Sequence, residues 1–191
     1  MTISTERLIL REYTVEDFSL MKSVYTDPEI MKYAYWDVYS DTKMRRYFEK
    51  VIEDNNRTEN RSAYEFAVFE KKSGQYIGSG DIDVDLKNNY GGYAEIGYFL
   101  LKSHWGKGYA AEIAKKLIEY CFDKLNLHKV YASCHALNKS SEKVMRKSGM
   151  KKEAVLKKVR FKNKQWHDEI RYAKMIDDWT ILQFMNGNKN D

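Results

Sequence analysis

Two glycines one residue apart, Gly106 and Gly108, join a predicted hydrophobic strand at residues 96–101 to a predicted amphipathic helix. Behind them, apolar residues recur at helical spacing from Ala110 to Phe122. The first N–H groups of a helix lack intrahelical acceptors and the helix dipole adds positive charge, so this end favours an anion such as a pyrophosphate. A tight turn or close packing is the alternative explanation. Neither G-x-G-x-x-G nor G-x-x-x-x-G-K-[ST] occurs here.

Several short segments of the chain fit one known arrangement in both order and spacing. They are Thr5-Glu6-Arg7-Leu8-Ile9-Leu10-Arg11, Glu95-Ile96-Gly97-Tyr98, Trp105-Gly106-Lys107-Gly108-Tyr109-Ala110, Asn138-Lys139-Ser140-Ser141 and Lys147-Ser148-Gly149-Met150. Over nearly its whole length the chain thereby resembles the GNAT acetyltransferases, in particular the branch that includes the ribosomal-protein N-terminal (alanine or serine) acetyltransferases. Ser103 departs from the superfamily's Q/R-x-x-G-x-G/A pattern, so one polar contact to the cofactor is either lost or supplied elsewhere.

The resemblance implies a mixed α/β fold of GNAT type: a mostly antiparallel central sheet of about seven strands, with a parallel pair around the acyl-CoA site and helices on both faces. The residue pattern agrees with this expectation. A strand at residues 129–134 follows the helix behind the glycines, and such a crossover makes it parallel to the strand at 96–101. Strands at 155–161 and 166–175, joined through Asn163-Lys164, are predicted to form an antiparallel hairpin.

A length of 191 residues fits one domain, which we place at residues 1–185, with a frayed tail at 186–191. No run of eighteen apolar residues and no signal-peptide pattern occurs, so the expectation is a soluble cytoplasmic protein with no membrane partner. Cys121 and Cys134 are too few for a disulfide framework and show no zinc spacing. We therefore expect no metal.

The resemblance also implies acetyl-CoA as co-substrate and gives positions for its contacts. The pantetheine arm would run along the strand at residues 99–101, the pyrophosphate would cap the helix at 106–110, and Asn138 would hold the pantetheine. Ser141 is the favoured partner of the departing thiolate, although simple capping of a short helix explains Ser140 and Ser141 equally well. The expected cofactor-binding residues are Phe99, Leu100, Leu101, Trp105, Gly106, Lys107, Gly108, Tyr109, Ala110, Asn138 and Ser140.

The acceptor must be a neutral amine when it attacks. Neutralising an α-amino group at pH 7 costs about 1 kcal/mol and a lysine about 4.6 kcal/mol, so an α-amine needs only a modest base. Glu95, beside the cofactor motif, is the first candidate, with a surface glutamate at a strand start as the alternative. The regular alternation of Asp81, Asp83 and Asp85 favours a solvated sheet face over a catalytic role. Weaker candidates are Asp168, His104 and His167.

Aromatic residues and charge bear on the acceptor and on partners. Tyr33, Tyr35 and Trp36 are predicted to line the acceptor side, with core packing as the alternative. Residues 143–174 contain 12 Lys or Arg against 3 Asp or Glu, whereas residues 1–60 contain 9 against 12. The basic part is a solvated face, an attraction for the anionic cofactor, or a docking surface for ribosome or RNA.

The function predicted from these features is transfer of an acetyl group from acetyl-CoA to a primary amine, by direct attack in a ternary complex. A protein N-terminal α-amine is the first acceptor considered, and a polyamine, an antibiotic or an amino-acid derivative is the alternative. A non-catalytic RNA- or ribosome-binding protein, or a CoA sensor, is the hypothesis of another class. Ribosome association and a homodimer are further expectations.

Overall fold

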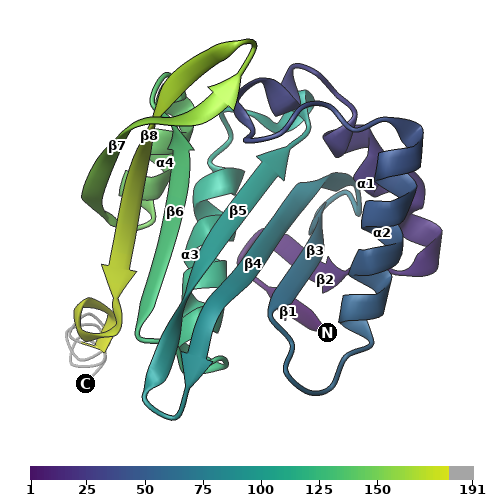
Figure 1. Cartoon of the computed structure of the whole chain (residues 1–191). Helices are drawn as coiled ribbons and strands as arrows, with labels where there is room; N and C mark the ends of the chain where they lie inside the picture. The colour runs from purple at the N-terminus through teal and green to yellow at the C-terminus, as the bar shows by residue number, and fades with distance from the viewer. Residues whose placement is uncertain (181–191) are drawn as a thin grey trace.

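The computed structural model describes residues 1–180, which contain an eight-stranded mixed sheet in the order β1-β2-β3-β4-β5-β6-β8-β7 (Figure 1). Every neighbouring pair is antiparallel except β5 and β6, so the expected parallel pair is confirmed. The sheet has one strand more than expected, because the short segment Thr2–Ser4 pairs with the next strand. The strands are β1 Thr2–Ser4, β2 Leu8–Glu12, β3 Ala63–Glu70, β4 Tyr76–Asn88, β5 Gly91–Leu100, β6 Lys129–His135, β7 Lys151–Lys162 and β8 Gln165–Met175.

Helices cover both faces of the sheet, as expected (Figure 1). Two of them, α1 and α2, lie on one face, and α3 and α4 lie on the other. Short 3₁₀ turns precede or connect them. The bounds are η1 Val15–Asp17, α1 Phe18–Tyr25, η2 Ile30–Tyr33, α2 Asp41–Asn55, η3 Lys102–His104, α3 Tyr109–Asp123 and α4 Lys139–Lys147.

Alternation along the central strands divides the core into two clusters. Successive side chains of a strand point to opposite faces, so Phe66 and Ile82 pack with the α3 side while Ala67 and Phe99 pack with the α1 and α2 side. The α3 face is apolar over most of its extent, with Lys174 near the end of β8 as a buried charged residue. The other face is apolar only under α1 and α2, and it carries polar side chains from β4 across to β8. The site described below lies on that second part.

The β7–β8 hairpin turns through two residues with positive φ, Asn163 at 51° and Lys164 at 62°. Positive φ at both central positions suits the twist of a two-residue hairpin, so the predicted turn is confirmed. Beside it, the Lys162 ammonium ties the hairpin to the segment that follows α1. It donates to three carbonyl oxygens, those of Met31 at 2.8 Å, Ala34 at 3.0 Å and Trp36 at 3.0 Å.

The single domain predicted for residues 1–185 extends past the described residues, and the frayed tail predicted at 186–191 lies wholly outside them. Within residues 1–180, no helix is both long and apolar enough to cross a bilayer. In the same part of the chain, no group of His, Cys, Asp and Glu side chains is arranged to hold a metal ion.

Candidate active site

The parallel strands β5 and β6 pair over only three residues and then separate. Tyr93 to Glu95 pair with Lys129 to Tyr131, whereas β5 continues to Leu100. Residues 96–100 therefore have no β6 partner, and their backbone groups on that side form an edge inside the sheet. Backbone N–H and C=O groups require partners, so an extended chain of amides could add to this edge as a strand. Glu95 stands where the opening begins.

One backbone group near the end of this edge is already bonded, because the Trp105 indole N–H donates to the Leu100 carbonyl at 2.8 Å. The Leu101 N–H points to the other side of the strand and donates to Ile77 O of β4 at 2.9 Å. The Trp105 side chain therefore folds back onto the end of β5. The part of the edge that stays open runs from residue 96 to Phe99.

The glycine turn lies above the N-terminus of α3. Gly106 and Gly108 have φ of 76° and 83°, a region that residues with a Cβ rarely adopt. A Cβ on Gly106 would meet no atom within 4 Å, so close packing does not explain this glycine. Gly108 is the N-cap of α3 and supplies no side chain to the first N–H groups. The turn and the first helical residues therefore suit an anion that approaches the backbone.

Arg7 of the loop before β2 holds this turn in place. Its Nη1 donates to Lys107 O at 3.1 Å, its Nε donates to Glu112 Oε2 at 2.7 Å, and its guanidinium lies 4.6 Å from the Tyr109 ring centroid. Sequence reasoning missed this role, because about a hundred residues separate Arg7 from its partners. Arg7 thus places a cation at the turn. The motif that contains this turn begins with Ser103, where the superfamily pattern has Gln or Arg.

A hydrogen-bonded pair spans the opening from β5 to α4. The Tyr98 hydroxyl lies 3.0 Å from Ser141 Oγ and 3.3 Å from Ser141 O. Burial raises the pKa of Tyr98 well above its usual value. The N-cap of α4 is Asn138, whose Oδ1 accepts from Ser141 N at 3.1 Å, so the capping role considered for Ser140 and Ser141 belongs to Asn138. The Ser141 hydroxyl is thus not used for capping.

Glu95 lies on the open face of the sheet, opposite Asp83 of β4 and Tyr131 of β6. Burial raises the pKa of Glu95, and the negative charge of Glu169 adds to this, while Arg171 opposes it. A carboxylate with a raised pKa is a better proton acceptor than an exposed glutamate. The alternative of an ordinary surface glutamate is not supported by this burial.

Asp81 and Glu65 adjoin Glu95 on the same face. The Asp81 carboxylate lies so close to Gly97 that a Cβ there would overlap it, and burial with the nearby Glu65 charge raises the Asp81 pKa well above normal. The expectation of a solvated face is therefore wrong for Asp81. It holds for Asp85, which is exposed and accepts from the Tyr131 hydroxyl at 2.8 Å.

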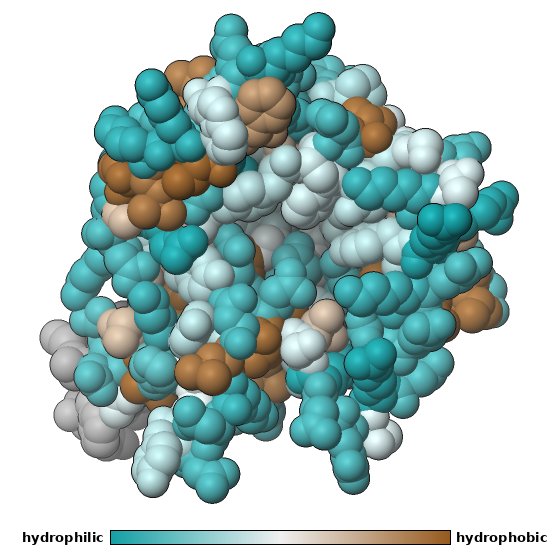
Figure 2. Space-filling view, viewed as in Figure 1, coloured by the Kyte–Doolittle hydropathy of each residue, from teal (hydrophilic) through white to brown (hydrophobic). Residues whose placement is uncertain are grey.

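Glu65 of β3 is 8% exposed, and its charge is poorly compensated. Tyr47 of α2 donates to Oε1, but Oε2 has no hydrogen-bond partner among the described residues. Burial raises the pKa of Glu65. Its side chain borders a cavity of about 200 Å³ between α2 and the sheet, and Figure 2 shows this face hollowed between α2 and the hairpin. The cavity is lined by Trp36, Tyr39, Tyr47, Lys50, Val51, Asp54, Asn55, Ala63, Glu65 and Asp83.

The predicted acceptor residues lie over this face. The Tyr35 hydroxyl donates to Glu169 at 2.6 Å, and the Trp36 ring packs at 6.4 Å from Phe99. Tyr33 contacts His135 at the end of β6, with ring centroids 5.5 Å apart. Burial and the charge of Glu95 raise the pKa of Tyr35.

The weaker candidates have structural partners elsewhere. Asp168 pairs with Lys157 at 2.9 Å and accepts from Lys158 N at 3.0 Å, so it supports an irregular part of β7. His167 Nε2 lies 3.2 Å from Lys162 O, and His104 Nδ1 lies 2.9 Å from Ser103 Oγ. None of these contacts joins them to Glu95.

A strand order with one opened parallel pair, a glycine turn on the following helix and a buried carboxylate at the opening define an acyl-CoA-dependent acetyltransferase. A family model described as "Acetyltransferase (GNAT) domain" matches residues 7–151, so the chain belongs to this family. It is an N-acetyltransferase of GNAT type, as the resemblance implied. Family membership also favours an enzyme over the non-catalytic alternatives.

Relatives extend over most of the chain. The uncharacterized N-acetyltransferase YnaD of Bacillus subtilis is 31% identical over 180 residues, covering 94% of this chain and 99% of that protein. A GNAT-family acetyltransferase structure from Bacillus anthracis is 28% identical, with a TM-score of 0.77 over 93% of this chain and 99% of its own.

The names of two other similar proteins state the acceptor of the acetyl group. The ribosomal-protein-serine acetyltransferase of Escherichia coli is 33% identical over 84 residues, 44% of this chain and 47% of that protein. The structure of spermidine N-acetyltransferase from Vibrio cholerae, in complex with CoA and spermine, is 22% identical, with a TM-score of 0.80 over 92% of this chain and 99% of its own. The second likeness concerns the fold alone.

Proposed function

We propose that the chain acetylates a primary amine that carries a second positive charge, and that a small polyamine-like molecule is the acceptor. The observation that carries this proposal is the buried Glu65 carboxylate, which borders the cavity with one oxygen unpartnered among the described residues. Asp83, another lining residue, is the β4 partner of Glu95. An uncompensated buried carboxyl is unfavourable when charged, and a bound cation would pair with it. Asp83 lines the same cavity and Asp81 lies on the same face, so a bound cation would meet further carboxyl groups there.

Glu95 would accept the proton of the attacking nitrogen, directly or through one water. The lone pair of the nitrogen then attacks the thioester carbon, and strand N–H groups near Phe99 stabilise the oxyanion. When the carbon–sulfur bond breaks, the Ser141 hydroxyl, which Tyr98 supports, donates a hydrogen bond to the departing thiolate, and the second proton lost by the nitrogen neutralises the sulfur. Cys134 is unsuited to act as a covalent nucleophile because burial raises its pKa to about 11.

The co-substrate would be held by backbone more than by side chains. The N–H groups of residues 106–110 would bind the pyrophosphate, with Arg7 as a nearby cation, and the edge at residues 96–99 would pair with the pantetheine. Asn138 uses its Oδ1 for the α4 cap, which leaves its amide N–H₂ to bind the pantetheine. Lys107 binds Arg7 through its carbonyl, and the Tyr109 hydroxyl binds Glu70.

Replacing Ser141 by alanine is expected to lower kcat about tenfold or more while the Kd for acetyl-CoA stays unchanged, because only the departing thiolate loses a hydrogen-bond donor. Steady-state kinetics and calorimetry measure the two quantities. Ser19→Ala is the matched control, since Ser19 is an exposed serine of α1, on the opposite face of the sheet from α4. Equal kcat in both variants and the wild type would remove Ser141 from the mechanism.

A protein N-terminus is the second acceptor candidate, and one observation favours it. Arg171 of β8 stands beside Glu95, and its Nε has no hydrogen-bond partner among residues 1–180. A peptide with a free α-amine presents a carbonyl oxygen close to that amine, which this guanidinium could bind. Ribosome association belongs to this candidate.

A panel of amines separates the two candidates. CoA release is measured with a linear diamine or triamine, a monoamine of equal length, and a peptide with a basic N-terminus. We expect a KM for the diamine about tenfold below that of the monoamine, since Glu65 pairs with the second ammonium. Because the Glu65 pKa is raised, this preference should grow as the pH rises above neutrality and the carboxyl ionises.

In the variant Glu65→Gln, the KM values for the diamine and the monoamine should become equal. In the control Asp85→Asn, at an exposed position, the difference between them should remain. Equal KM values for monoamine and diamine in the wild type would contradict the role of Glu65. Turnover with the peptide alone would assign the site to protein N-termini.

A further inference from the structure

A second cavity lies on the opposite side of the sheet, away from the glycine turn. It has a volume of about 390 Å³ and lies between α3, the end of α4 and the end of β8. Its α3 residues, 115–119, begin about two turns after Tyr109, where the proposed pyrophosphate site is located. The lining residues are Lys115, Ile118, Glu119, Lys147, Ser148, Gly149, Lys174 and Trp179.

Lys174 is the unusual member of this lining. It is 5% exposed, and within residues 1–180 its ammonium makes no hydrogen bond and no ion pair. The buried Lys162 ammonium, by contrast, has three carbonyl acceptors. An ammonium on a side chain buried to this degree keeps little of its water and has no acceptor among the described residues, which is unfavourable.

The charges around Lys174 do not compensate it. Lys115 and Lys147 line the same cavity, and Glu119, the acidic lining residue, pairs with Lys116. Asp178 is near but pairs with Lys151 at 2.8 Å. Burial lowers the pKa of Lys174 and the charge of Lys115 lowers it further, although Asp178 opposes both.

The end of α4 supplies only a small part of what is missing. Lys174 Nζ would lie 3.2 Å from a Cβ on Gly149, so it stands at the negative end of the α4 dipole. That interaction is small compared with the penalty for burying an ion. The Trp179 ring, 5.1 Å from Nζ, adds a cation–π contact of about the same small size as the dipole.

We infer that this cavity binds a phosphate-bearing small molecule, at a site separate from acetyl-CoA and from the acceptor. Three lysines suit a phosphate, which carries close to two negative charges at pH 7 and several acceptor oxygens, better than a single carboxylate. Ile118 and Trp179 provide an apolar wall for the rest of the ligand. The inference does not depend on the proposed acceptor.

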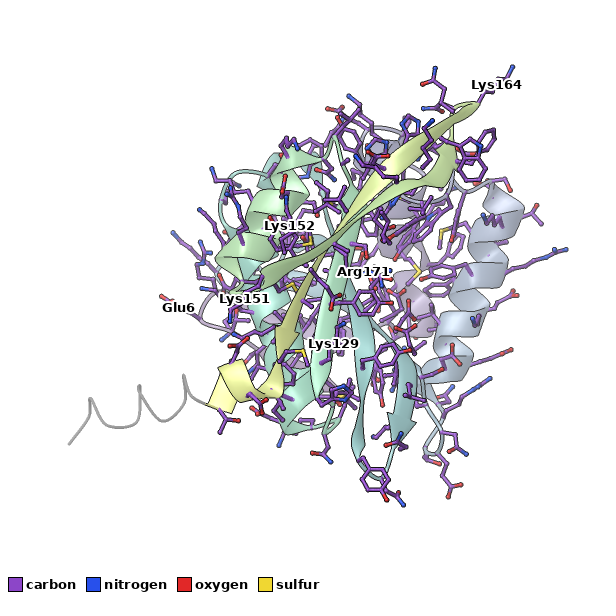
Figure 3. The ribbon with its side chains drawn as sticks, turned by 60° about the vertical axis from the view of Figure 1, so that its left-hand side comes forward. Glu6, Lys129, Lys151, Lys152, Lys164 and Arg171 are labelled. Atoms are coloured by element: carbon purple, nitrogen blue, oxygen red, sulfur yellow. The ribbon has the colours of Figure 1, made fainter. Side chains whose placement is uncertain are left out.

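Inorganic phosphate is the probe, added to the full chain with and without saturating coenzyme A, which keeps phosphate off the glycine turn. Calorimetry and thermal unfolding should both report binding. Lys174→Met, which keeps the side-chain length, should weaken the Kd for phosphate about tenfold or more. It should also raise the Tm without phosphate, because a buried unpaired charge is removed. Lys164→Met at the hairpin tip is the charge-matched control (Figure 3).

The inference is overturned if Lys174→Met binds phosphate as the wild type does, or if phosphate acts no more strongly than sodium chloride of equal ionic strength. A larger effect of citrate than of phosphate would overturn the assigned ligand class. If saturating coenzyme A abolished phosphate binding, the phosphate would be assigned to the glycine turn and the inference would be wrong. If the wild type showed no acetyltransferase activity with any amine, the proposed function would be contradicted, but the phosphate-binding measurement would still test this inference.

Discussion

Glu95→Gln is expected to lower kcat by about 10² to 10⁴ while the Kd for coenzyme A stays within a factor of about two, because general-base catalysis contributes that much and the amide keeps the shape of the carboxylate. Glu95 is at the start of the opening between β5 and β6, where an amine and the thioester would meet. Kinetics over an amine panel and calorimetry with coenzyme A check the two halves of this expectation.

The pH dependence gives the same prediction a second readout. The base must be deprotonated, and burial raises the Glu95 pKa, so kcat should fall on acidification at a higher pH than an ordinary glutamate would produce. The Glu95→Gln variant should lose this acidic limb. Exposed Asp85→Asn serves as the control and should keep it. Wild-type kcat in Glu95→Gln would transfer the role to Asp81 or Glu65.

Gly106→Val is expected to weaken the Kd for coenzyme A about a hundredfold, because the new side chain would occupy the space in which an anion approaches the turn. The positive φ adds backbone strain of about 1–3 kcal/mol, which should lower the Tm. Calorimetry and thermal unfolding measure the two effects separately.

Gly74→Val is the matched control for this strain. Gly74 has φ of 69° in the turn between β3 and β4, and a Cβ there also meets nothing within 4 Å. The two variants should therefore lose similar stability, but only Gly106→Val should lose affinity for coenzyme A. If both bind coenzyme A as tightly as the wild type, the turn has a structural role alone and the proposed cofactor site is wrong.

The parts of the fold that follow local rules could be predicted from the sequence. Helical and strand periodicities placed α3, β6 and the β7–β8 hairpin, and the two positive-φ residues Asn163 and Lys164 mark its turn. The short strand Thr2–Ser4 was missed, because three residues carry no periodic signal and depend on pairing with β2. Homodimer formation and ribosome association stay predictions.

The sequence pattern predicted only some of the residues of the candidate site and little of their environment. Alternation placed Asp81, Asp83 and Asp85 on one face of a strand, but it could not tell that neighbouring elements bury part of that face or that Glu95 lies on it. Glu65 and Arg7 were missed for a related reason: both act through partners on other elements, and the contacts of Arg7 span about a hundred residues. Long-range packing, which no local window contains, determines their environment.

The attachment of Lys162 to the carbonyls of Met31, Ala34 and Trp36 bears on how acceptor preference can be re-engineered. The segment carrying Tyr35 and Trp36 is shaped by an ammonium from a hairpin more than a hundred positions away. Grafting that segment alone from a relative would transfer the acceptor-side residues without the hairpin lysine that holds their backbone in place. Chimaeras that exchange both pieces together should inherit the donor's selectivity, whereas single-segment swaps should yield promiscuous or inactive hybrids.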